Sequence, residues 1–257
     1  MLYMKRFFKG FFMSFGMFCA IPVPYREWDE SCADLVIPFF PVVGLLIGAL
    51  WYGAAQLLIL AGLSTVMLSA FLMLFPNIIT GFLHIDGFMD TNDAILSRRP
   101  PEEKLRILKD PHAGAFAVVS VLALFVICFA STYEIVADVS GTGKLFFFLF
   151  MPVISRSLAG TALLSLKTMP QSNYGSYFKK NVKAVHKISL VLMGILAATS
   201  ACIVLGIEGA IVVAAMIAGF FLSTLHAYRQ FGGISGDLSG YALTVSEACA
   251  LVALALV

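Results

Sequence analysis

Long apolar runs alternate with short polar segments along most of this chain. Residues 35–83, between Asp34 and His84, include no charged side chain over 49 positions. One membrane-spanning helix needs only about 20 residues, so this run is too long for a single span. A turn at residues 61–64 therefore predicts two helices, near Leu35–Leu60 and Ser64–Leu83.

The same pattern continues through the rest of the chain and predicts further apolar helices. We expect them over Gly114–Ser131, Leu145–Leu166, Ile188–Leu205 and Ala210–Tyr228, with a last helix that ends at Val257. The expected fold is all-α: a polytopic integral membrane helical bundle of six to seven transmembrane helices. Residues 1–30 are aromatic and basic and are expected to form an interfacial N-terminal segment. A short amphipathic helix is expected within Arg98–Lys109, where prolines and acids precede bases.

Composition supports a membrane location. Of the 257 residues, 60% are hydrophobic and only 12% are charged, whereas soluble domains carry about 25% charged residues. The mean hydropathy is +0.93. We therefore treat residues 1–257 as one membrane-embedded domain whose partner is the lipid bilayer. A net charge of +2 gives no reason to expect a nucleic-acid partner.

The distribution of basic residues predicts the orientation. Lysine and arginine gather in residues 5–9, 98–109 and 167–187, whereas the alternate connections hold only Lys144. Basic loops face the cytoplasm in multi-pass proteins. Residues 84–113, a loop of acids and bases, and residues 230–240, rich in glycine, would then share the cytoplasmic side of the inner cell membrane.

Three aspartates follow directly on an apolar run. Asp86, Asp90 and Asp93 stand at helical spacing and would share roughly 60° of a helix surface. Such close carboxylates repel one another, and a divalent cation relieves that repulsion. Oxygen ligands favour Mg²⁺, with Mn²⁺ as the alternative. The competing interpretation is an acidic face exposed to water at the membrane surface.

The segment Phe231–Gly240 holds four glycines in ten residues. Its backbone N–H groups, at Gly233 and Gly236 in particular, are candidates to contact an anion closely. Asp237 would add a fourth carboxylate to the metal site, since this loop is predicted on the same side as Asp86. The simpler explanation is that the glycines only turn the chain.

Two further residues are candidates for catalysis. Arg156 interrupts an apolar run, where a central arginine costs about 2.5–3.5 kcal/mol, so we expect it to pair with one of the aspartates above or with a phosphate. A purely structural ion pair is the equal alternative. His84 precedes Asp86 by two residues and is a candidate base, although an unbroken helix would place it on the opposite face; a structural histidine is the simpler interpretation.

Four segments in order resemble the cobalamin synthase family, the adenosylcobinamide-GDP ribazoletransferases. The run HIDGFMDTND is similar to the signature HxDGxxDTxD, KDPHAGAF to KDxxxGxF, and GGISGD to GGxTGD; Ile21–Pro24 followed by Phe40–Gly44 resembles the N-terminal pattern. Three positions depart from the family: Phe82 replaces a common glycine, Ser235 a threonine and His112 an arginine.

The resemblance implies a Mg²⁺-dependent transferase. It would join adenosylcobinamide-GDP to α-ribazole, or to its 5′-phosphate, and release GMP in the last steps of cobalamin nucleotide-loop assembly. The implied metal ligands are Asp86 and Asp90, joined by Asp93 and Asp237. Catalytic candidates are Asp86, Asp90, His84 and Arg156, and Lys109 joins the two loop glycines as a binding candidate.

Two other classes fit parts of the pattern. A CDP-alcohol phosphotransferase is also helical and acidic, but its DGxxAR element is missing because Asp86-Gly87 is followed by Phe-Met-Asp. A membrane transporter would explain Arg156, whereas clustered acids beside a glycine loop favour chemistry. The oligomeric state, monomer or homo-oligomer, is left open by the sequence.

Overall fold

The computed structural model describes residues 2–25, 27–138, 143–170 and 177–257. Within these ranges the chain is helical apart from turns and one isolated bridge between Thr168 and Ile234. The helices are α1 (Leu2–Phe18), α2 (Ala33–Val36), α3 (Phe40–Leu60), α4 (Thr65–Ile79), α5 (Leu83–Leu96), α6 (Pro101–Ile107), α7 (Ala115–Ala137), α8 (Phe147–Ser165), α10 (Ala184–Phe231) and α11 (Gly236–Leu256), with short 3-10 turns η1 (Glu30–Cys32) and η2 (Lys144–Phe146).

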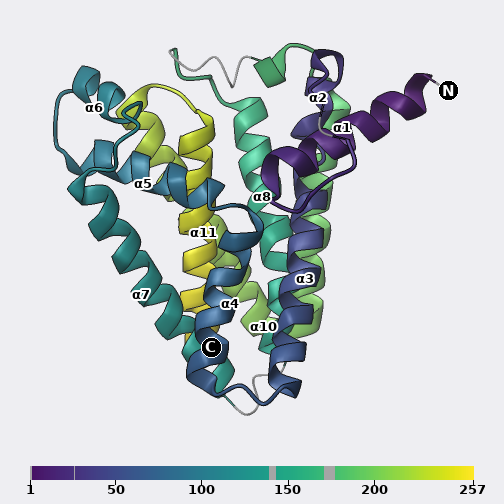
Figure 1. Ribbon diagram of the computed structural model, residues 1–257, viewed down its shortest axis with the longest axis vertical. Helices are drawn as coiled ribbons and strands as arrows, with labels where there is room; N and C mark the ends of the chain where they lie inside the picture. The colour runs from purple at the N-terminus through teal and green to yellow at the C-terminus, as the bar shows by residue number, and fades with distance from the viewer. Residues whose placement is uncertain (1, 26, 139–142, 171–176) are drawn as a thin grey trace.

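The long helices form the predicted membrane bundle (Figure 1). Five of the described helices, namely α3, α7, α8 with η2, α10 and α11, are long and apolar enough to cross a bilayer, and the bent pair α4–α5 makes a sixth candidate. α8 packs against α3, α10 and α11 and so occupies the middle of the bundle. The all-α, polytopic prediction is confirmed.

α10 is counted above as one helix, but the chain reverses direction part-way along it. Gly206 has φ 59° and ψ −133°, which is not helical. A Cβ added at Gly209 would lie 2.5 Å from the carbonyl oxygen of Ala201, a contact that a straight helix forbids across eight residues. The predicted hairpin between residues 188 and 228 is therefore present, and each of its legs has the length of a membrane crossing.

The close packing of α3 on α8 depends on two glycines. A Cβ at Gly44 would lie 2.4 Å from the carbonyl oxygen of Pro152, and one at Gly48 would lie 2.5 Å from that of Leu149. Small residues four positions apart let two helix backbones approach in a membrane. This contact fixes the position of α8, and with it the position of Arg156.

The predicted helix over residues 64–83 ends earlier than expected. The chain leaves α4 at Thr80 and turns through Gly81 and Phe82, with φ angles of 61° and 60°. α5 then runs at 91° to α4, across the end of the bundle (Figure 1). Phe82 takes a left-handed conformation that glycine adopts without strain. The predicted helix near Leu35–Leu60 is also corrected, because a break at residues 37–39 separates α2 from α3.

Polar segments gather at one end of the bundle. α1, α2, α5, α6 and the connection into α11 lie at the top of Figure 1, whereas the α3–α4 turn and the C-terminus lie toward the bottom. The two segments predicted to share a side, residues 84–113 and 230–240, are therefore at the same end. We call it the site end.

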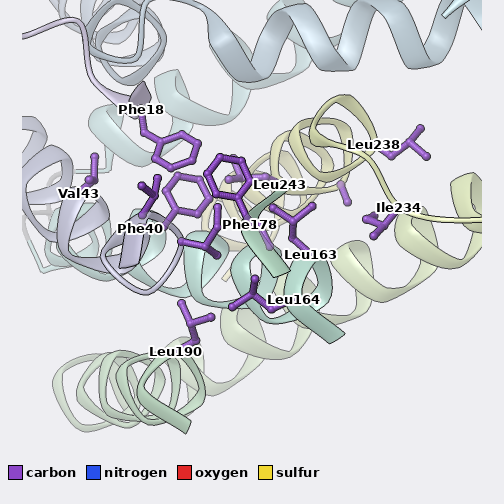
Figure 2. Packing of buried hydrophobic residues seen from close by; sticks show 14 of the residues in the cluster. Phe18, Phe40, Val43, Leu163, Leu164, Phe178, Leu190, Ile234, Leu238 and Leu243 are labelled. Carbon is purple, nitrogen blue, oxygen red and sulfur yellow. The ribbon is translucent and has the colours of Figure 1, made fainter. Parts of the chain in front are cut away.

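Each end of the bundle has its own apolar core. At the site end, Figure 2 shows Phe18, Phe40 and Phe178 beside Leu163 and Leu243, which come from five separate parts of the chain. At the opposite end, Trp51 stacks on Phe148 with ring centroids 4.1 Å apart, and its indole N–H donates to the carbonyl oxygen of Leu72 at 2.8 Å. Together the two cores hold the helices of the bundle in place.

Candidate active site

The site is built where α5 crosses the start of α11. Gly87 makes the crossing possible, because a Cβ there would lie 2.7 Å from the carbonyl oxygen of Asp237. One turn further along α11, a Cβ at Gly240 would lie 3.5 Å from the Cα of His84. The acidic segment and the glycine-rich segment thus pack backbone to backbone, as their shared side predicted.

A cavity of about 340 Å³ opens beside this crossing. Its polar wall comprises His84, Asp86, Gly236, Asp237 and Ser239, and its apolar wall comprises Phe18, Ile37, Phe40, Leu83, Ala159, Gly160, Leu163, Gly240 and Leu243. Asp86 and Asp237 each lie in the first turn of their helix. Helix N-termini favour negative charge, which offsets part of the repulsion between the two carboxylates.

The pKa of Asp90 indicates that the acidic side chains lie close together. Burial and the charges of Asp86, Asp237 and Asp93 raise the pKa of Asp90 to about 6. Asp90 is half-buried, whereas Asp86 and Asp237 are exposed. The carboxylates therefore form one interacting group at an open surface, which attracts cations.

Asp93 has a structural partner of its own. Its Oδ1 accepts a hydrogen bond from the backbone N–H of Ala117 at 3.2 Å, in the first turn of α7. Gly114 lies against the same carboxylate, so a Cβ at residue 114 would overlap it. Asp93 thus caps the start of α7, and its metal-ligand role stays a prediction.

The carboxylates do not form a closed metal site. Across the described ranges, no three His, Cys, Asp or Glu side chains converge closely enough to hold a metal ion by themselves. Mg²⁺ typically takes one or two carboxylates and completes its shell with water and substrate phosphates. An all-oxygen donor set at an open cavity fits that mode of binding, in which the substrate supplies the missing ligands.

The glycine-rich segment is explained mainly by backbone packing. Gly232 ends α10 in the left-handed region at φ 72°. A Cβ at Gly233 would lie 2.5 Å from the backbone nitrogen of Met169, and the neighbouring N–H of Ile234 donates to the carbonyl oxygen of Lys167 at 2.8 Å. Of the two glycines expected to bind an anion, only Gly236 lines the cavity.

Ser235 is the N-cap of α11, a position that suits both serine and threonine. Its Oγ accepts a hydrogen bond from the N–H of Leu238 at 3.3 Å. Lys109 is exposed in the connection between α6 and α7 and does not line the cavity. The predicted anion-binding roles of Lys109 and Gly233 stay predictions that no contact with the cavity supports.

Arg156 pairs with a residue that the sequence analysis missed. Its Nη1 donates to Glu247 Oε1 at 2.7 Å and to Ser155 Oγ at 3.0 Å, and the side chain is 1% exposed. The expected pairing with one of the aspartates of α5 is corrected, and the alternative of a structural ion pair is what the structure shows, with Glu247 on α11 as the partner. Glu247 is the only acid after Asp237 in the sequence, and an acid in an apolar helix was the signal for it.

Arg156 nevertheless lies near the cavity. Its guanidinium carbon is 5.7 Å from the ring centroid of Phe40, and that ring is 5.8 Å from the His84 ring. Its Nε is buried without a hydrogen-bond partner among the described residues. Arg156 therefore supports the cavity from below through Phe40.

His84 and Asp86 line the same cavity, although both lie within the unbroken helix α5. Residues two apart on a helix point in different directions; accordingly Asp86 is exposed, whereas His84 is turned inward. The side chain is buried, and Nε2 has no partner among the described residues. Burial and the charge of Arg156 hold the pKa of His84 well below its ordinary value, so the imidazole is neutral at physiological pH.

These features define a class: a polytopic membrane protein with a cavity that carries two carboxylates at one end of its helix bundle. The sequence comparisons identify the family within that class. The family model described as "Cobalamin-5-phosphate synthase" matches residues 10–255. The chain belongs to this family.

Similar proteins cover nearly the whole chain. An adenosylcobinamide-GDP ribazoletransferase of Clostridium botulinum is 40% identical over 95% of this chain and 96% of its own length. The protein of that name from Clostridium perfringens is 37% identical over 99% and 100%, and one from Lachnoclostridium phytofermentans is 32% identical over 94% and 91%. No solved structure matches the chain.

Proposed function

We propose that this protein is a membrane transferase that joins adenosylcobinamide-GDP to α-ribazole, or to α-ribazole 5′-phosphate, and releases GMP. Relatives of that name align with the chain from end to end. The observation that carries the proposal is that Asp86 and Asp237, from two motifs about 150 residues apart, line one cavity. The products would be adenosylcobalamin or its 5′-phosphate.

The proposed reaction is an in-line displacement at phosphorus. A ribose hydroxyl of ribazole, distinct from the 5′ position that can carry a phosphate, forms a bond from its oxygen to the phosphorus attached to cobinamide, and the bond from that phosphorus to the oxygen shared with GMP breaks. The hydroxyl proton goes to a base, and GMP leaves with the electron pair of the broken bond. Charge accumulates on the phosphoryl and leaving oxygens, so catalysis needs positive groups placed there in advance.

We propose that one or two of the carboxylates of Asp86, Asp90 and Asp237 hold Mg²⁺, or Mn²⁺, and that the pyrophosphate supplies further ligands. Such an ion would supply the positive charge that the phosphoryl oxygens need. The crowding that raises the pKa of Asp90 supports a cation at this place. The first turn of α11 would add partial positive charge from its backbone.

We propose His84 as the base, with one of the aspartates as the alternative. It is neutral, lines the cavity and has a buried Nε2 without a partner among the described residues. Arg156, by contrast, is engaged with Glu247. We therefore propose that Arg156 positions Phe40 and His84 and does not contact a phosphate.

We propose the inner cell membrane as the location, with the site end in the cytoplasm. Basic segments 5–9, 98–109 and 167–187 belong to that end or its connections, and the positive-inside rule supports this orientation. Both nucleotide substrates would then reach the cavity from the cytoplasm. Accessibility labelling of a cysteine introduced at exposed Glu102 would test the orientation.

The test of the function is turnover of two matched variants in detergent. Asp86→Asn should lower GMP release about 100-fold or more, since a carboxylate that holds a catalytic ion is worth several kcal/mol. The control, Glu102→Gln, changes an exposed acid at the same end that is outside the cavity and should leave turnover unchanged.

Near-normal turnover of Asp86→Asn at saturating Mg²⁺ would refute the metal role. Turnover of a CDP-linked alcohol without release of GMP from adenosylcobinamide-GDP would favour the phosphotransferase alternative. Uptake into sealed vesicles without GMP release would favour a transporter.

A further inference from the structure

A second cavity, larger than the acidic one, lies beside α1. Its residues have no part in the proposed reaction. Its volume is about 730 Å³. Its walls come from the second half of α1, from the segment that follows it, and from Tyr177 and Phe178. Pockets of this size accommodate a group as large as a nucleoside.

Aromatic side chains form one end of this cavity. Trp28 donates its indole N–H to the hydroxyl of Tyr177 at 2.9 Å, and their ring centroids are 6.0 Å apart. Phe178 packs edge-on against Trp28, with centroids 6.2 Å apart. Although Trp28 is held by these contacts, it remains 47% exposed. A fixed, accessible aromatic face binds planar bases by stacking, at about 1–3 kcal/mol for each base.

Among the described residues, Glu27 is the only carboxylate that lines the cavity. The nearby Asp29 is already paired, because Lys9 Nζ lies 2.7 Å from its carboxylate. A carboxylate accepts two parallel hydrogen bonds, and guanine offers two adjacent donors, N1–H and the 2-amino group. The base of a ribazole carries no N–H donor, so it would offer no hydrogen bond to the Glu27 carboxylate.

The end of α1 separates this cavity from the acidic cavity. Phe18 lines the acidic cavity, whereas Cys19 and Ala20 line the aromatic one. Ala20 is tied to the entry of α5, since its N–H donates to the carbonyl oxygen of Ile79 at 2.7 Å. Consecutive residues of one segment therefore line the two cavities, so the cavities are neighbours on either side of the end of α1.

We propose that the aromatic cavity is the guanine site of the GDP-linked substrate and of the GMP product, with Glu27 reading the N1–H and 2-amino edge and Trp28 stacking on the ring. This inference rests on the proposed function, because it places the leaving nucleotide beside the cavity in which the transfer occurs. It assigns Trp28, Glu27 and Tyr177 to substrate recognition and not to the chemical step.

The test is equilibrium binding of GMP, IMP and AMP to the intact protein in detergent, without the corrinoid substrate. The chain has two tryptophans; Trp51 is 1% exposed, so nucleotide-dependent quenching is expected from Trp28. GMP should bind about 10-fold or more tightly than IMP, which lacks the 2-amino group, since a hydrogen bond to a charged group is worth about 1.5–3 kcal/mol.

Two variants decide the assignment. Glu27→Gln should lower GMP affinity about 10-fold and bring it close to IMP affinity, and Trp28→Phe should remove the quenching signal. Glu30→Gln, an exposed acid outside the cavity, should change neither. Equal affinity for GMP and IMP, an unchanged preference in Glu27→Gln, or no saturable signal with GMP would overturn the proposal.

The outcomes also separate this inference from the function itself. If the wild-type protein releases GMP during turnover while Glu27→Gln keeps its base preference, only the guanine site is wrong. If GMP binds with the expected preference but no turnover of adenosylcobinamide-GDP occurs, the proposed reaction is wrong and a guanine-nucleotide site remains.

Discussion

The two ends of the bundle differ in whether their buried polar groups have hydrogen-bond partners. At the end opposite the site, Trp51 is buried, stacked and hydrogen-bonded, and the surrounding core is apolar. At the site end, carboxylates crowd together, and the Nε2 of His84 is buried without a partner among the described residues. Buried polar groups are normally satisfied, so the contrast is what we expect if ligands complete the site end and the opposite end supplies stability.

The largest expected effect concerns the ion pair between these two ends. Glu247→Ala would leave Arg156 buried without its counter-charge, which typically costs about 3–5 kcal/mol of stability. We expect a sharply lower midpoint of thermal unfolding in detergent. The matched change Glu208→Ala, in the second leg of α10, should have little effect. Equal stability of the two variants would show that Arg156 has another partner.

The next effect concerns the crossing of α5 and α11. Gly87→Ala places a Cβ 2.7 Å from the carbonyl oxygen of Asp237, so the two helices must separate and Asp86 must move away from Asp237. We expect GMP release to fall about 10- to 100-fold, because small displacements of positioned groups are costly in catalysis. Gly53→Ala is the control, since nothing lies within 4 Å of that Cβ; equal activity of both variants would show that the crossing is not essential.

A smaller effect follows from the crowded carboxylates. The pKa of Asp90 is about 6 in the folded protein, above its ordinary value, so folding favours the protonated form. The contribution of Asp90 to stability should therefore be most favourable below pH 4 and be lost as pH rises from about 4 to 6. Without divalent ions, Asp90→Asn should be about 1 kcal/mol more stable than the wild type at pH 8, because half-exposure screens the repulsion.

Thermal unfolding at pH 8 and pH 4, with a chelator present, measures this difference. The advantage of Asp90→Asn should disappear at pH 4, where the wild-type carboxyl is protonated. An advantage that persists unchanged at pH 4 would contradict the electrostatic explanation.

The smallest effect concerns the turn between α4 and α5. Phe82 has φ 60°, a conformation that costs a non-glycine residue about 1–2 kcal/mol. Phe82→Gly relieves that strain but adds flexibility to the unfolded chain, so we expect a net gain below about 1 kcal/mol. A slightly higher unfolding midpoint would confirm it, whereas Phe82→Ala, which keeps a Cβ, should show no gain.

The sequence predicted the architecture well because hydrophobic runs and basic loops report directly on the bilayer. The hairpin at Gly206 and the shared end of residues 84–113 and 230–240 followed from these two signals alone. The break at Gly81 and Phe82 was missed, because apolar residues continue through it and periodicity does not reveal a left-handed turn. The partner of Arg156 was missed for a related reason: pairing depends on helix packing, and Glu247 is 91 residues away.

The sequence by itself determined that this chain is a membrane bundle of the cobalamin synthase family, because apolar length, charge placement and local motifs do not depend on how helices pack. Only the tertiary structure decided which polar groups meet. Asp86 and Asp237 come together because α5 and α11 cross closely at Gly87. Asp93 instead accepts a hydrogen bond from the first turn of α7, and Arg156 pairs with Glu247. Those outcomes are set by backbone approach between helices distant in sequence, and one Cβ is enough to change them.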